Sequence, residues 1–138
     1  MAVFSSSSQL YNLLQQLFNK IKEDPNAVRS VASSRIVIRL QISAPAAVVT
    51  IDGRGNPVKV DYGPASSRPD LEVSLSADSL HQILLGELSL RKAVAGGQMK
   101  VKGPFWKTFA LQEILRQGQA LYPAIYRAAS DSGSLSQA

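Results

Sequence analysis

The segment from Gly86 to Leu115 constrains the fold of this chain more than any other. Glycines at 86, 97 and 103 surround a short apolar strand, and a strongly apolar helix follows the third of them. Between these glycines, no nucleophilic side chain is paired with a base. A segment of this kind is better suited to holding an apolar group than to reacting with it.

The helix expected after Gly103 is apolar over more than half of its circumference. At ~100° per residue, its apolar side chains fall into two adjoining sectors. One sector contains Phe105, Trp106, Phe109 and Ala110, and the other contains Leu111, Ile114 and Leu115. A surface helix needs only one apolar stripe, so this helix must bury two faces. One face can lie on a sheet. The second can meet the N-terminal helix, another subunit or a bound apolar ligand, unless the helix is simply buried in the core.

Hydrophobic periodicity predicts the remaining helices. Apolar residues from Leu10 to Ile21 recur at helical spacing, with Ser8 as the expected N-cap and Asp24-Pro25 at the end. A short helix is expected over 26–32. Ser76 is expected to cap a helix that ends near Gly86, and another short helix over 90–95.

Alternation of apolar and polar residues predicts the strands. They are expected over 36–42, 46–52, 57–62, 71–75 and 99–102, the first with one apolar and one largely polar face. The order of elements favours an α+β domain, with helices gathered on one face of a mainly antiparallel sheet. We expect a single domain over residues 1–129 and a disordered C-terminal tail over 130–138, which is polar and rich in small residues.

Reactive side chains are scarce. The chain has no cysteine and a single histidine, His81, and a lone histidine is more often a surface or structural residue than a catalytic base. The aspartates are dispersed over strands and turns, which does not suit a metal site. We therefore expect no catalytic residue, no metal and no cofactor, and hence a protein that is not an enzyme.

The net charge of +5 is unevenly distributed. No acidic residue lies between Glu87 and Glu113, whereas this interval contains Arg91, Lys92, Lys100, Lys102 and Lys107. These cations either solubilise one face or attract an anionic membrane surface. Nucleic acid is a weaker option, because no arginine-rich helix or aromatic strand accompanies them. We predict transient membrane contact through Lys100, Lys102 and Lys107, and no nucleic-acid partner.

The ends of the sequence and its apolar runs predict a location. The N-terminus lacks a basic region followed by an apolar one, so a secretory signal is not expected. No apolar run approaches the roughly 20 residues of a membrane span. A cytoplasmic protein is the expectation.

The spacing of glycines and apolar residues resembles the sterol carrier protein-2 (SCP2) sterol-binding domain family. The ungapped pattern consists of Gly86, Leu88, Ala93, Gly97, Met99, Val101, Gly103 and Leu111-Gln112. Upstream, Asp52-Gly53, Tyr62-Gly63 and Asp70 fit the strands of the same family, so the resemblance covers roughly residues 28–115. It implies a five-stranded sheet covered by helices, with an apolar tunnel between them that binds acyl chains, acyl-CoA, sterols or phospholipids.

Two hypotheses for function follow from these observations. The first is non-enzymatic binding, with transfer, of a lipid in the tunnel that the resemblance implies. The lining residues we expect are Leu84, Met99, Val101, Phe105, Trp106, Phe109 and Leu115. The alternative is a structural module that forms a homodimer or binds a partner protein through the apolar helix face.

Overall fold

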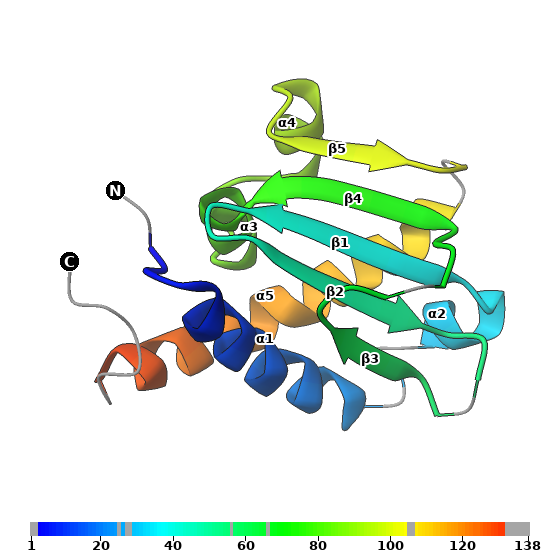
Figure 1. Cartoon of the computed structure of the whole chain (residues 1–138), viewed down its shortest axis with the longest axis horizontal. Coiled ribbons are helices and arrows are strands. Elements are labelled where there is room, and N and C mark those ends of the chain that lie inside the picture. Colours follow the sequence, from blue (N-terminus) through cyan, green and yellow to red (C-terminus); the bar gives the residue numbers. More distant parts are fainter. Residues whose placement is uncertain are drawn as a thin grey trace.

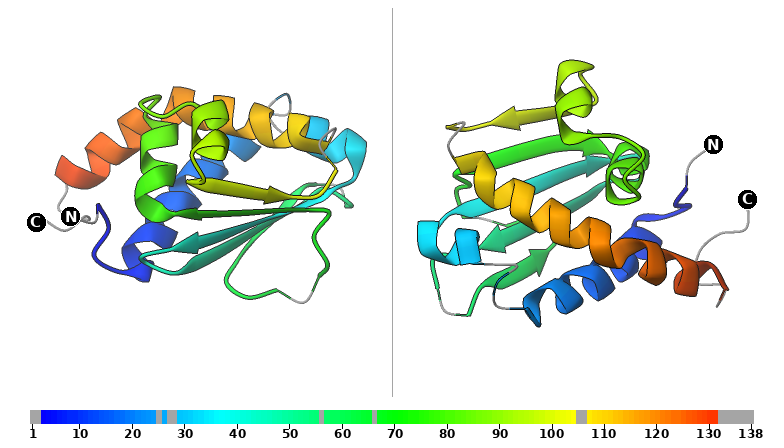
Figure 2. Two further views of the ribbon diagram at one scale, coloured as in Figure 1. Left: turned by 90° about the horizontal axis from the view of Figure 1, so that it is seen from above. Right: turned by 180° about the vertical axis from the view of Figure 1, so that it is seen from behind.

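Five strands form one mixed sheet, and the helices gather on one of its faces (Figure 1, Figure 2). The computed structural model describes residues 3–24, 26, 29–55, 57–65, 67–104 and 107–131. The helices are α1 (Ser7–Lys22), α2 (Arg29–Ser34), α3 (Ala77–Leu84), α4 (Leu90–Ala95) and α5 (Thr108–Asp131). The strands are β1 (Val37–Ser43), β2 (Ala47–Asp52), β3 (Lys59–Tyr62), β4 (Leu71–Ser76) and β5 (Met99–Lys102).

The strand order in the sheet is β3-β2-β1-β4-β5. The neighbours β1–β2, β2–β3 and β4–β5 are antiparallel, whereas β1 and β4 pair in parallel with Leu40 opposite Val73. The α+β class and the mainly antiparallel sheet predicted from the sequence are therefore confirmed. Strand β5 lies at one edge of the sheet and pairs with β4.

The helix boundaries follow local capping chemistry. Helix α1 begins two residues earlier than expected, because its N-cap is Ser6 and not Ser8. The Ser6 hydroxyl accepts a hydrogen bond from the Gln9 amide at 3.2 Å. Ser76 caps α3 as predicted and accepts from the Ser79 amide at 3.0 Å. The short second helix lies later than predicted, over Arg29–Ser34.

The outer face of β1 is not the solvated polar face that alternation predicted. Val37 and Arg39 are buried along with the inward-facing Ile38 and Leu40. The segment connecting β3 to β4 passes across this face, on the side away from the helices (Figure 2). The Arg39 guanidinium donates to the Ser67 carbonyl there and to the Thr50 hydroxyl at 3.4 Å. A connecting segment, which strand periodicity does not report, buries these residues.

Helix α5 runs diagonally behind the sheet and packs against both α1 and α3 (Figure 2). Gly118 permits this approach, because a Cβ atom built there would lie 2.8 Å from Leu84 Cδ2. The α5 sector that contains Leu111, Ile114 and Leu115 lies in part against α1. The N-terminal helix is thus one partner of α5, as one of the alternatives from the sequence proposed. Since α5 continues to Asp131, it includes the first two residues of the expected tail; residues 132–138 lie outside the described part, and the domain boundary stays a prediction.

Candidate functional site

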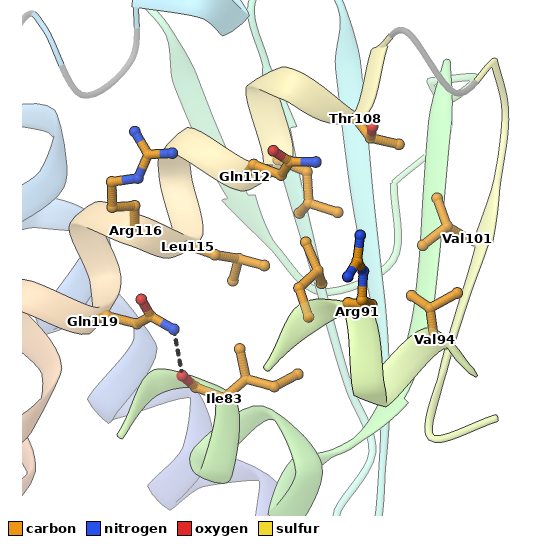
Figure 3. Close-up of a pocket in the computed structure, with 11 residues that line it drawn as sticks. Ile83, Arg91, Val94, Val101, Thr108, Gln112, Leu115, Arg116 and Gln119 are labelled. Carbon is orange, nitrogen blue, oxygen red and sulfur yellow. Dashed lines mark hydrogen bonds between the residues drawn. The ribbon is translucent and has the colours of Figure 1, made fainter. Parts of the chain in front are cut away.

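An open pocket of about 510 Å³ lies between α3, α4, β5 and the first half of α5 (Figure 3). Its apolar wall is formed by Ile83, Leu90, Val94, Val101, Leu111 and Leu115. Its polar lining consists of Arg91, Thr108, Gln112, Arg116 and Gln119. The volume falls within the range of roughly 300–1,000 Å³ that is usual for small-molecule sites.

Local sequence explains how α4 and β5 supply one side of the pocket. The Ser89 side chain caps α4 by accepting from the Lys92 amide at 3.1 Å. Leu90, Arg91 and Val94 then share a face, because residues three and four apart are neighbours on a helix. On β5, side chains alternate, so Val101 reaches the pocket while Lys100 points to the opposite face of the sheet.

Gly103 positions α5 against the sheet edge. Its φ of +133° favours glycine, and a Cβ atom there would lie 2.5 Å from the Asp70 carbonyl oxygen. The chain therefore passes directly over the start of β4 before α5 begins. Thr108, Gln112, Leu115 and Gln119 follow at helical spacing and present one side of α5 to the pocket.

At its inner end the pocket is bounded by a link between α3 and α5. The Gln119 amide nitrogen donates to the Ile83 carbonyl oxygen at 2.9 Å (Figure 3). Ile83 itself is fully buried. This contact joins the helix that carries most of the polar lining to the one that forms the floor.

The charged rim of the pocket is cationic. Arg91 and Arg116 are exposed, and neither is in an ion pair within the part of the chain that the structure describes. No Asp or Glu is among the residues that line this pocket. A pocket of this kind can hold the apolar part of a ligand against its wall, while a polar part lies near the arginines.

The structure brings together only some of the residues predicted to line a tunnel. Val101 and Leu115 line the pocket. Leu84 and Met99 are core residues that do not line it, and Leu84 instead contacts a small internal cavity of about 20 Å³ between α1 and α5. Phe109 is 70% exposed. Phe105 and Trp106 lie outside the described residues.

Most of the pocket was missed because its lining comes from three helices and a strand edge. In the sequence, Arg91 stands out only as part of a basic stretch and Gln112 only within the Leu111-Gln112 pair of the family pattern, and nothing marks Arg116. Their spacing from Thr108 to Gln119, along the border of the apolar sector of α5, is the signal that could have indicated them.

The basic stretch is divided among different surfaces. Lys100 lies beside Gln41 and Ser74 on the sheet face opposite the helices. Lys107 forms an ion pair with Asp70 at 3.3 Å. Of the cations considered, Arg91 lines the pocket.

The lone histidine belongs to the helix packing. His81 is buried on α3, and its Nδ1 lies 2.7 Å from the Tyr122 hydroxyl of α5. Burial lowers the pKa of His81, against smaller opposing effects of Glu87 and Asp78. Among the described residues, no group of three or more His, Cys, Asp or Glu side chains could hold a metal ion.

A sheet with one helix-covered face and an apolar pocket at its edge defines a domain that binds apolar ligands. The chain belongs to the SCP-2 sterol transfer family, whose model matches residues 13–116. Lipid binding and transfer is therefore its general role. Among curated proteins, no sequence relative was found. No helix of the described residues has the length and apolar character needed to cross a membrane.

Solved structures share this fold at low sequence identity. The sterol carrier protein domain 2 of Helicoverpa armigera has a TM-score of 0.66 and 20% identity, covering 86% of this chain and 91% of that one. Palmitated SCP2L2 from Aedes aegypti has a TM-score of 0.57 and 23% identity, covering 75% and 90%. The sec-alkylsulfatase Pisa1 from Pseudomonas sp. has a TM-score of 0.52 and 19% identity, covering 65% of this chain but 14% of the enzyme. The fold thus also occurs as a small part of an enzyme.

Proposed function

We propose that this chain binds the hydrocarbon part of a lipid in the pocket between α4, β5 and α5 and releases it unchanged. The observation that carries the proposal is the continuous apolar wall formed by Ile83, Leu90, Val101, Leu111 and Leu115. The structural likeness to palmitated SCP2L2 from Aedes aegypti supports an acyl chain as one ligand class.

The hydrophobic effect alone provides enough affinity for a carrier. Each buried methylene contributes ~0.8 kcal/mol, so a chain of about ten methylenes gains ~8 kcal/mol before ordering costs. This corresponds to a dissociation constant of about 1 μM. A carrier needs affinity of this order, because a much tighter complex would release its lipid slowly.

Binding is tested with delipidated, folded protein and a fluorescent long-chain fatty acid. We expect saturable binding with a stoichiometry near one, and displacement by unlabelled acyl chains. Mass spectrometry of the released lipid should show that it is chemically unchanged. Absence of saturable binding would contradict the carrier function, and a modified product would indicate catalysis.

Lipid transfer requires contact with a membrane, and the mouth of the pocket is the surface we propose for it. The sequence predicts that this membrane contact runs through Lys100, Lys102 and Lys107. In the structure Lys100 faces away from the pocket, so we propose the mouth of the pocket as the contact surface instead. The two large apolar side chains that are most exposed, among the residues described, are Val94 at 47% and Phe109 at 70%. Val94 lines the pocket, and Phe109 follows the lining residue Thr108 on α5.

Transfer of a fluorescent lipid to vesicles tests this contact. It should be faster to anionic than to neutral vesicles, and salt should remove the difference, because exposed charges are screened beyond ~8 Å at physiological ionic strength. Phe109→Ala should slow transfer, whereas Lys100→Glu with Lys102→Glu serves as the control on the opposite face. If only the lysine variant transferred lipid more slowly, the membrane contact would be made by the lysines and not by the mouth of the pocket.

A protein-interaction module remains the second candidate function, because Phe109 and Val94 also suit a protein interface or a homodimer. Native mass spectrometry separates the two. A bound lipid mass on the monomer supports the carrier, and a ligand-free oligomer supports the module. The cytoplasmic location likewise stays a prediction, which imaging of a tagged protein would test.

A further inference from the structure

A cleft rich in arginine lies between α2 and the connection from β2 to β3. Helix α2 lies at the end of the sheet where β2 ends (Figure 1). This arginine cleft has a volume of about 670 Å³, and no Asp or Glu is among the described residues that line it. They are Arg29, Ala32 and Ser33 of α2, Arg35 directly after α2, and Gly53, Arg54 and Gly55 of the connection. None of them lines the apolar pocket beside β5.

Backbone contacts hold the two walls of the arginine cleft together. A Cβ atom at Gly53 would lie 2.4 Å from the Val31 carbonyl oxygen, so the connection lies directly on α2. The Gly53 amide donates to the Ile36 carbonyl at 2.8 Å. The Arg35 guanidinium donates across the cleft to the Arg54 carbonyl at 3.2 Å. The fold therefore fixes the position of α2 relative to the connection.

The three guanidinium groups of the cleft differ in their partners. Arg54 binds the Asp52 carboxylate with two hydrogen bonds, of 3.1 Å from Nε and 2.9 Å from Nη2, so its charge is compensated. Arg29 donates to the Asn26 side-chain oxygen and Arg35 to a backbone carbonyl, both of which are uncharged acceptors. Neither Arg29 nor Arg35 is in an ion pair with a residue that the structure describes. Two exposed cations without a counter-charge therefore line one cleft.

Arg35 occupies a backbone position that favours glycine. It has a φ of +53°. Its amide donates to the Ala32 carbonyl at 3.3 Å, and the Ile36 amide donates to the Val31 carbonyl at 3.4 Å. This pair of bonds is the Schellman motif, in which glycine is the usual residue because a side chain strains the left-handed backbone. An arginine costs stability there, which points to a use for its guanidinium group.

We propose that the arginine cleft binds the phosphate group of a phosphate monoester, with Arg29 and Arg35 as its cationic ligands. A monoester carries close to two negative charges at neutral pH, which match the two uncompensated guanidinium groups. Guanidinium also fits phosphate geometry with paired, charge-assisted hydrogen bonds. The proposal does not depend on lipid binding in the apolar pocket, because the two sites have no lining residue in common.

Calorimetric titration of the full-length protein with glycerol phosphate, at constant ionic strength, tests the site. We expect saturable binding with a stoichiometry near one, and NMR chemical-shift changes confined to α2 and the β2–β3 connection. Arg29→Gln with Arg35→Gln should weaken binding about tenfold or more, because it removes the charge-assisted hydrogen bonds. Lys100→Gln with Lys102→Gln is the matched control, which removes the same net charge outside the cleft and should leave binding unchanged.

Arg35→Gly separates ligand binding from a role in the fold. Glycine suits a φ of +53°, so this variant should unfold at an equal or higher urea concentration than the wild type and yet bind glycerol phosphate more weakly. Unchanged binding in this variant or in the double glutamine variant would overturn the proposal. An equal loss of binding in the lysine control would also overturn it, because net charge alone would then explain the affinity.

A vesicle experiment distinguishes the two sources of such a phosphate group. Phosphatidic acid presents a phosphate monoester on a membrane, whereas glycerol phosphate presents the same group in solution. Co-sedimentation with phosphatidylcholine vesicles that contain phosphatidic acid compares the wild type with Arg29→Gln, Arg35→Gln. Weaker sedimentation of the variant assigns a lipid headgroup to the cleft. Unchanged sedimentation, together with weaker binding of glycerol phosphate, assigns a soluble ligand.

Discussion

His81 Nδ1 lies 2.7 Å from the Tyr122 hydroxyl oxygen, and this contact joins α3 to α5 inside the helix layer. The Tyr126 ring lies at the same place, with its centroid 4.6 Å from that of His81 and stacked on Tyr122. The Phe4 ring also lies against the imidazole, nearly perpendicular to it. The only histidine of the chain is therefore held by one hydrogen bond to Tyr122 and by the aromatic rings around it.

Tyr122→Phe should destabilise the protein by about 1–3 kcal/mol, because it leaves the buried His81 nitrogen without its partner. The double variant His81→Phe with Tyr122→Phe should recover part of this loss, since it removes both polar partners. Urea unfolding curves of the single and double variants measure the difference. If the double variant lost as much free energy of unfolding as the two single variants together, or more, this account would be contradicted.

The stability should fall as the pH drops below about 6.5. Burial lowers the pKa of His81 in the folded protein from its ordinary value of 6.5. Between the folded and unfolded pKa values, the unfolded chain binds more protons, so its stability relative to the folded state rises as pH falls, by up to about 1.4 kcal/mol per pH unit. Above 6.5 this contribution is complete. Urea unfolding at pH 7.5 and 5.5 should show a smaller pH effect in the double variant than in the wild type.

Gly103→Ala should destabilise the protein more than Gly97→Ala. Both glycines have positive φ, so alanine is strained at either position by about 1–2 kcal/mol. At Gly97 no atom lies within 4 Å of the added Cβ, whereas at Gly103 it would lie 2.5 Å from the Asp70 carbonyl oxygen. Thermal unfolding compares the two variants, and equal losses would show that the close approach of the chain to β4 does not matter.

Val94→Trp should block the pocket with little loss of stability. Val94 lines the pocket and is 47% exposed, so a larger side chain there can fill the cavity without overpacking the core. Binding of the fluorescent fatty acid should weaken about tenfold or more if several methylenes lose their contacts. Val60→Trp, on β3 away from the pocket, is the control and should leave binding unchanged.

Phe109→Ala should leave the free energy of unfolding within about 0.5 kcal/mol of the wild type, because the ring is already 70% exposed. Leu111→Ala, two residues further along α5, should cost about 2–5 kcal/mol, because Leu111 is fully buried. Chemical denaturation measures both. A large loss for Phe109→Ala would mean that the ring packs in the core in solution.

Local sequence predicted the features that depend on neighbours along the chain. Helical spacing from Leu10 to Ile21 identified the buried face of α1, and Ser76 was correctly expected to cap α3. The glycines at 86, 97 and 103 indicated the family, and each has a positive φ, which favours glycine at that position. These signals are strong because caps, turns and periodicity arise within a few residues.

What covers each buried face was decided by tertiary structure. Periodicity could not show that the β3–β4 connection buries Arg39, that α1 covers part of α5, or that Phe109 would be exposed. The pocket depends on α3, α4, β5 and α5 meeting around one space, and its lining residues Arg91 and Arg116 are 25 positions apart in the chain. Hydrophobic patterning in the sequence indicates which residues are buried. Which part of the chain buries each of them depends on the tertiary packing.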